Sequence, residues 1–164
     1  MRTLIKKILK EQLNPIKWVK PHFEDEKDEF MNHFLGWYFG EILKVEPDLM
    51  SRDEMDKYID DIPVQYNKAK VEPLTDEEWS KLENTDSWGI NSEDELYDVI
   101  HGMWGRSKER ISKYSIEPIK NGGVVETPII VYSEGNPPYL VAGNTRLSAC
   151  KVFGVRPMVT KVYL

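Results

Sequence analysis

Four consecutive residues in the C-terminal third of the chain have types that suit an anion-binding site: Gly143, Asn144, Thr145 and Arg146. The first turn of a helix leaves backbone N–H groups without partners and carries partial positive charge, so phosphate binds well there. An arginine adds a permanently charged, forked donor. We therefore expect these residues to bind a nucleotide or another phosphorylated ligand. The same spacing also suits a plain helix cap formed by Asn144 or Thr145, with Arg146 in solvent.

The neighbouring residues predict a strand, a glycine turn and a helix that together position this group. Residues 139–142 form a short apolar run, which is typical of a buried strand. Gly143 then permits a sharp turn of the backbone. From Thr145 onward the apolar residues recur at helical spacing, and Gly154 is suited to end the helix.

A longer pattern surrounds this turn. The segments Thr127–Tyr132 and Tyr139–Ala149 and the Gly-Val-Arg-Pro sequence that ends at Pro157 follow one another in the order of a PIxV…GxxRxxAxxxxG motif. Over roughly residues 106–164 the chain thus resembles the ParB/sulfiredoxin superfamily. The resemblance implies a small α+β domain in which the glycine turn and its arginine hold triphosphate oxygens. It also implies a nucleoside triphosphate with Mg²⁺ as the bound cofactor.

Departures from the family pattern limit which chemistry the resemblance can imply. Asn144 stands where sulfiredoxin-like members place their catalytic cysteine, and Cys150 falls on the apolar face of the predicted helix, as a core residue would. CTP-binding members usually carry two arginines after an acidic residue or a histidine, whereas Asn144 and Thr145 precede the single Arg146 here. Kinase-like members use an aspartate where Ala142 stands. These changes favour binding of a phosphorylated ligand over its turnover.

Two further function classes stay open. An NTP hydrolase or a ParB-like nuclease would need an acid or base beside the pocket, and Glu126 and Glu134, both in expected loops, are the candidates near the motif. The sequence otherwise leaves the catalytic residues unknown. A structural or assembly protein with a vestigial pocket is the third hypothesis. Short proteins with a Gly-Asn-Thr-Arg version of the motif are similar to phage-encoded proteins, which suggests a phage or mobile-element origin.

Composition excludes several classes. The 164 residues are 40% hydrophobic and 11% aromatic, which is enough for a packed core. The single cysteine excludes a disulfide framework, and the three histidines are isolated from one another, so we expect no metal site of the protein's own. No apolar run approaches the roughly 20 residues needed to cross a bilayer, and the N-terminus does not read as a secretory signal. We expect a cytoplasmic protein, in the host cytoplasm if it is phage-encoded.

Charge is distributed unevenly along the chain. The net charge is −6, but residues 1–20 and 101–164 are basic and residues 21–100 are strongly acidic. An acidic middle repels a phosphate backbone and weakens the hypothesis that the protein binds DNA. The basic C-terminal third suits an anion pocket without requiring a nucleic-acid partner.

We predict an α+β protein in two regions: an acidic, mainly helical region over 1–89, and a ParB/sulfiredoxin-like domain over 90–164 with a small mixed β-sheet and surrounding helices. The basic, amphipathic helix expected over residues 1–13 suits a protein partner, a second copy, the protein's own core or a membrane surface. Further helices are expected over 25–44, from Ser51 to before Pro63, from Thr75, from Ser92 and over 107–120, and a last strand over 157–164.

Overall fold

The computed structural model describes residues 2–5, 15–38, 40, 51–104 and 108–164. The protein belongs to the α+β class, with small mixed sheets and helices packed around them. In these described ranges no helix combines the length and the apolar character that a membrane crossing requires. Most of the helix expected over 1–13 falls outside the described ranges, as does the C-terminal part of the helix expected over 25–44.

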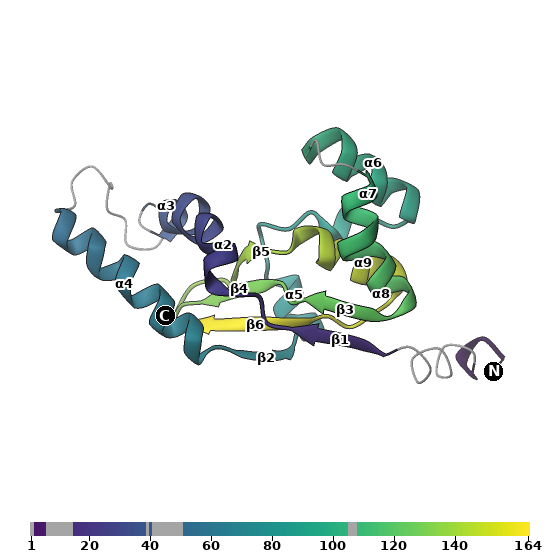
Figure 1. The fold of residues 1–164 in the computed structure, drawn as a ribbon, viewed down its shortest axis with the longest axis horizontal. Helices are drawn as coiled ribbons and strands as arrows, with labels where there is room; N and C mark the ends of the chain where they lie inside the picture. Colours follow the sequence, from purple (N-terminus) through teal and green to yellow (C-terminus); the bar gives the residue numbers. More distant parts are fainter. Residues whose placement is uncertain (1, 6–14, 39, 41–50, 105–107) are drawn as a thin grey trace.

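A four-stranded mixed sheet lies at the centre of the fold (Figure 1), with the strand order β2-β6-β4-β5. The pair β4–β6 is parallel, while β2–β6 and β4–β5 are antiparallel. The last strand in chain order is therefore internal to the sheet. The strands are β2 (Lys70–Pro73), β4 (Ile129–Tyr132), β5 (Tyr139–Ala142) and β6 (Met158–Tyr163).

A second, two-stranded parallel sheet joins β1 (Ile16–Val19) to β3 (Gly123–Glu126). The chain passes from β3 directly into β4 through Thr127 and Pro128, and this connection is tied to both neighbours. The Thr127 amide donates to Val19 O at 2.8 Å, and the Thr160 amide of β6 donates to Pro128 O at 2.8 Å. The hydroxyls of Thr127 and Thr160 are buried and 2.6 Å apart.

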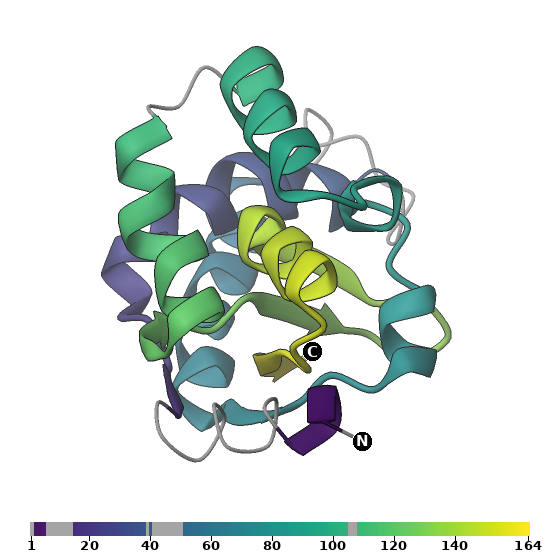
Figure 2. The ribbon, with the colours of Figure 1, turned by 90° about the vertical axis from the view of Figure 1, so that its right-hand side faces the viewer.

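Each face of the four-stranded sheet contributes to a different core. Because side chains alternate along a strand, Ile129 and Val131 pack with one cluster and Ile130 with the other. The first cluster is aromatic and includes Phe30, Phe34 and Tyr66 from the helices that follow β1. The second is largely aliphatic and comes from the helices after β2. Figure 1 shows the first helix group near one end of the strands and most of the second group near the other end, which faces the viewer in Figure 2.

One helix of the first group, α4, is longer than the sequence predicts. This helix continues through Pro63, although we expected the helix to end before that residue. The reason is burial: Ile62 and Tyr66, one helical turn apart, both pack in the aromatic core, which outweighs the hydrogen bond lost at proline. The group comprises α2 (Phe23–Glu29), the π-helical turn η1 (Phe30–Phe34), α3 (Leu35–Trp37) and α4 (Arg52–Lys68).

The second helix group confirms most of the helix starts that we predicted. Thr75 and Glu78 form the expected capping box at α5, and the Ser92 hydroxyl accepts from the Glu95 amide at 3.1 Å before α6. The helix expected over 107–120 is present as three consecutive segments. The group comprises α5 (Asp76–Ser80), the 3₁₀ turn η4 (Ser87–Gly89), α6 (Glu93–Trp104), α7 (Lys108–Ile111), the π-helical turn η5 (Ser112–Ile116), α8 (Glu117–Asn121) and α9 (Asn144–Phe153).

The expected boundary at residue 89 is crossed by both sheets. Strand β1 pairs with β3, and β2 pairs with β6, so each sheet joins a strand from the 1–89 region to one from the 90–164 region. Neither β1 nor β2 is predicted from the sequence pattern. Lys20, at the end of β1, also donates to Tyr66 O and to Ala69 O (3.0 Å) at the end of α4. The two strand pairings hold residues from the two regions in one folded unit.

Candidate functional site

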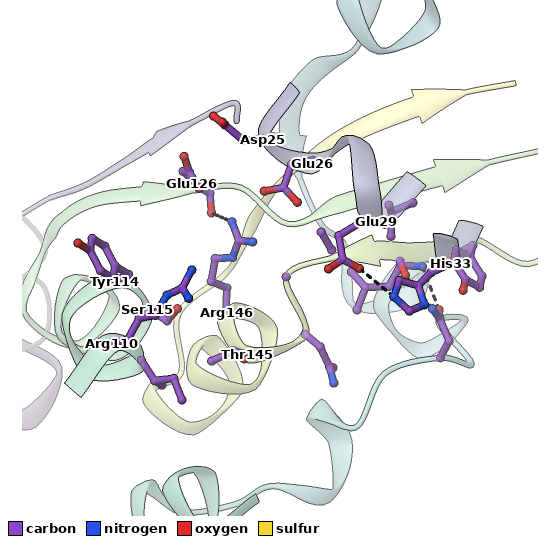
Figure 3. Close-up of a pocket in the computed structure, with 18 of the residues that line it drawn as sticks. Asp25, Glu26, Glu29, His33, Arg110, Tyr114, Ser115, Glu126, Thr145 and Arg146 are labelled. Atoms are coloured by element: carbon purple, nitrogen blue, oxygen red, sulfur yellow. Dashed lines mark hydrogen bonds and ion pairs between the residues drawn. The ribbon is translucent and has the colours of Figure 1, made fainter. Parts of the chain in front are cut away.

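The four residues proposed for anion binding line a cavity of about 1280 Å³. Three helical segments and a loop surround it. Figure 3 shows α2 above, the segment from α7 to η5 at one side, and the start of α9 below. The loop at Asn84 and the ends of β3 and β5 complete the wall. The cavity therefore combines residues from both of the predicted regions of the chain.

The turn before α9 is fixed by a close approach of two backbones. Gly143 has a φ of +104°, and a Cβ atom placed there would lie 2.7 Å from both Cα and Cβ of Pro128. Only glycine fits this conformation and this gap without strain. The Leu147 amide makes the first helical bond, to Gly143 O at 3.0 Å, and no side chain caps the helix start in the described structure. The residues of the first turn of α9 thus lie at the cavity wall.

Arg146 extends from α9 toward the end of β3 (Figure 3). Its Nη1 donates to Glu126 O at 2.9 Å and to Thr127 O at 3.3 Å. These two carbonyls fix the guanidinium group at the cavity wall instead of leaving it in bulk solvent. The side chain thus ties the helix to the strand and also gives the cavity a fixed positive charge.

Asn144 and Thr145 line the cavity in different ways from Arg146. The Asn144 amide group accepts from Thr85 Oγ1 at 2.8 Å and donates to Asp86 Oδ2 at 3.2 Å. Its side chain therefore anchors the loop before η4, and only its backbone suits an anion. Thr145 is buried. Of the four predicted residues, Gly143 and Arg146 have the geometry that an anion site requires most clearly.

Beside Arg146 the cavity has an acidic wall that the sequence pattern does not predict. It consists of Asp25, Glu26 and Glu29 on α2 and Glu126 at the end of β3. Burial raises the pKa of Glu26 above its usual value, and the charges of Glu126, Glu29 and Asp25 raise it further, while Arg146 acts in the opposite direction. The cavity therefore holds charges of both signs, and Glu26 is the carboxyl whose ionisation is opposed most.

The two glutamates proposed as acids or bases have different positions. Glu126 ends β3 and lines the cavity, so our expectation that it lies in a loop was wrong. Glu134 lies in the turn between β4 and β5 and does not line the cavity. Cys150 is fully buried, as predicted for a core residue, and burial raises its pKa. Across the described ranges, no group of three or more metal-ligating side chains could hold a metal ion.

Several cavity residues come from segments whose role was not apparent in the sequence. The acidic run over 24–29 was interpreted only as a helix start, where acids are common for electrostatic reasons. Glu26, Glu29 and His33 are three and four positions apart, so on a helix they share one face. This spacing is the sequence signal that could have indicated an acidic cavity wall.

The basic residues Arg106, Lys108 and Arg110 ahead of the motif suit either the pocket rim or a solvated helix face. Arg110 lines the cavity, together with Tyr114 and Ser115. Arg106 lies outside the described residues.

No family model, curated protein or solved structure matches the chain. Fold, charge and cavity geometry are therefore the observations from which a function can be inferred.

Proposed function

We propose that this protein is a ParB-like binding module for a nucleotide or another phosphorylated ligand, with the phosphate groups at the Gly143 turn and Arg146. The main observation in support is that the uncapped start of α9 and the Arg146 guanidinium line the same cavity. The amides at a helix N-terminus and an arginine guanidinium both bind phosphate well in proteins. The ligand class agrees with the one implied by the resemblance of residues 106–164 to the ParB/sulfiredoxin superfamily.

The size of the cavity also supports this proposal. Small-molecule sites usually have volumes of about 300–1000 Å³, and this cavity, at about 1280 Å³, has room for a nucleoside triphosphate. A magnesium ion would enter with the nucleotide, because nucleotide sites usually hold it through phosphate oxygens and one or two carboxylates. Glu26 and Glu126 are the carboxylates that suit this role, since both line the cavity near Arg146.

A thermal-shift titration tests the proposal. Wild-type protein is titrated with ATP, CTP and GTP, each with MgCl₂, beside Arg146→Ala and Arg156→Ala. Arg156 is a matched control because its side chain is 61% exposed and does not line the cavity. A ligand at 100 times its Kd adds about 2.7 kcal/mol of stability. We expect a shift for wild type and Arg156→Ala and none for Arg146→Ala. No shift with any nucleotide would favour the structural or assembly hypothesis.

Hydrolysis of the bound nucleotide is a second candidate function, favoured by one observation. Glu26 and Glu126 line the cavity that also holds Arg146, and Glu26 has a raised pKa, as a general base working near neutral pH often does. Release of inorganic phosphate from ATP or CTP measures this activity. Loss of release in Glu26→Gln or Glu126→Gln, with nucleotide binding retained, would establish the hydrolase. If the wild-type protein binds nucleotide but releases no phosphate, the protein is a binding module and the hydrolase hypothesis is wrong.

A further inference from the structure

One wall of the cavity carries two exposed apolar side chains in addition to polar groups. Tyr114 on η5 and Val124 on β3 both line the cavity, and each is 60% exposed. A single exposed apolar side chain is ordinary on a protein surface. Here two of the most exposed large apolar side chains of the described residues come from different elements and border the same cavity. This is the arrangement of a surface that an apolar or aromatic group covers.

A phosphate group alone does not account for this wall. Phosphate needs amides and cations, which the start of α9 and Arg146 supply, and it gains nothing from an aromatic ring. An aromatic ring beside a phosphate site suits a nucleobase, because every base has a π face that stacks on it. Ser115 and Arg110, which line the same wall, add polar groups that could reach the edge of a base.

The other aromatic residue of the cavity is less suited to this role. Tyr139 is stacked on Trp37, with ring centroids 4.3 Å apart, and contacts Phe34 at 5.9 Å. Its ring therefore belongs to the aromatic core under the sheet. Lys113 lies 5.0 Å from the ring centre of Tyr114 but does not line the cavity. The Tyr114 ring is thus the one that the cavity presents to an incoming group.

We propose that Tyr114 and Val124 form a base subsite, in which a nucleobase stacks on the Tyr114 ring while its phosphates occupy the Gly143 turn and Arg146. This inference rests on the proposed function and narrows it: the ligand is a nucleoside di- or triphosphate, not inorganic phosphate or a sugar phosphate. Stacking tolerates every base, so the subsite adds affinity for all nucleotides more than it selects one of them.

Isothermal titration with two kinds of probe tests the subsite. ATP and CTP carry a base, and inorganic tripolyphosphate carries only the phosphates; each is titrated with MgCl₂ into wild type and three tyrosine variants. Tyr114→Ala removes the ring and Tyr114→Phe keeps it. Tyr163→Ala is the matched control, because Tyr163 is 58% exposed and does not line the cavity. Circular dichroism confirms that each variant is folded.

We expect Tyr114→Ala to weaken ATP and CTP binding by roughly 5- to 100-fold, the range that removal of one stacking partner produces. Its affinity for tripolyphosphate should stay within about twofold of wild type, and Tyr114→Phe and Tyr163→Ala should bind all three probes as wild type does. Unchanged nucleotide affinity in Tyr114→Ala, or an equal loss for tripolyphosphate, would overturn the base subsite.

The two proposals fail in different ways. If wild type binds tripolyphosphate as tightly as ATP and CTP, the phosphate site stands and the base subsite is wrong. If wild type binds none of the three probes, the proposed function is wrong and the base subsite falls with it.

Discussion

This protein has two clusters of charged side chains, one packed within the fold and one that lines a cavity. In the first, Glu78 accepts from Lys161 Nζ at 2.6 Å, from the Thr75 amide at 2.9 Å and from Tyr132 Oη at 3.3 Å. Lys161 is only 7% exposed. All of these partners belong to the chain, and the group joins α5 to β4 and β6. We refer to these four residues as the closed cluster.

The second cluster is the cavity of about 1280 Å³, which holds charges of both signs. Glu26 and Glu126 line it together with Arg146, whose guanidinium is fixed by the backbone carbonyls of Glu126 and Thr127. The charges of the closed cluster stabilise the fold, whereas the charged side chains of the cavity line a space that a ligand can enter. Substitutions in the closed cluster should therefore change stability, and most of those in the cavity should change affinity.

The largest effect is expected where the cavity meets the core, at Gly143→Ala. The added Cβ would lie 2.7 Å from Pro128, and a φ of +104° is strained for any L-residue. We expect a loss of about 3 kcal/mol in the free energy of unfolding. Urea denaturation measures it, with Gly36→Ala as the control, because a Cβ at Gly36 meets no atom within 4 Å. Equal stability of the two variants would contradict the tight turn.

In the closed cluster, Lys161→Met should destabilise the fold by about 2 kcal/mol, because it leaves the Glu78 carboxylate without its cation. Urea denaturation measures the loss, and adding Glu78→Gln to the same chain should recover part of it. Nucleotide affinity should stay as in wild type, because neither residue lines the cavity. If Lys161→Met keeps its stability but no longer binds nucleotide, the closed cluster serves binding and the distinction between the two clusters is wrong.

The stabilisation by Glu78 should depend on pH. Burial tends to raise the pKa of Glu78, but hydrogen bonds from Lys161 and Thr75 outweigh it, so the pKa lies below its usual value of 4.5. A lowered pKa gives stability that is present above the unfolded-state value and is lost as the pH falls through the folded-state value. Wild type should exceed Glu78→Gln by about 1 to 2 kcal/mol at pH 7. Thermal unfolding from pH 7 to pH 2.5 should show this difference shrinking below about pH 4.

The smallest effect is expected from the acidic wall of the cavity. Charged Glu26 repels a bound anion, so Glu26→Gln should tighten tripolyphosphate binding on the order of fivefold at pH 7 without magnesium. Because the pKa of Glu26 is raised, Glu26 becomes protonated more readily as the pH falls, and the advantage of the variant over wild type should shrink. Isothermal titration from pH 7 to pH 5 measures both. Glu24→Gln, whose side chain is 79% exposed and outside the cavity, is the control.

The sequence predicted the parts of the site that depend on local geometry. The strand at 139–142, the glycine turn at 143 and the helix ending at Gly154 are all present, because an apolar run, a turn glycine and a helical period are local signals. The position of Glu126 on a strand was missed. Strand β3 exists because β1 pairs with it, and a pairing between residues about 100 positions apart leaves no local signal.

The acidic wall was missed for a similar reason. The sequence placed residues 24–29 at the start of a helix, which is confirmed, but not beside Arg146. That placement depends on β1 and on the Lys20 contacts with the end of α4, which hold α2 over the ends of β3 and β5. Local patterns thus predicted the part of the cavity at the Gly143 turn and Arg146, and long-range packing determines the rest.

The internal position of β6 has a consequence for synthesis. The ribosome makes β2 and β4 well before β6, yet these two strands reach each other only through β6. During translation both would expose unpaired edges until residues 158–163 leave the exit tunnel, and such edges promote misassembly. The nascent chain should therefore complete its sheet in one late step, and it should depend on chaperones most strongly just before that step.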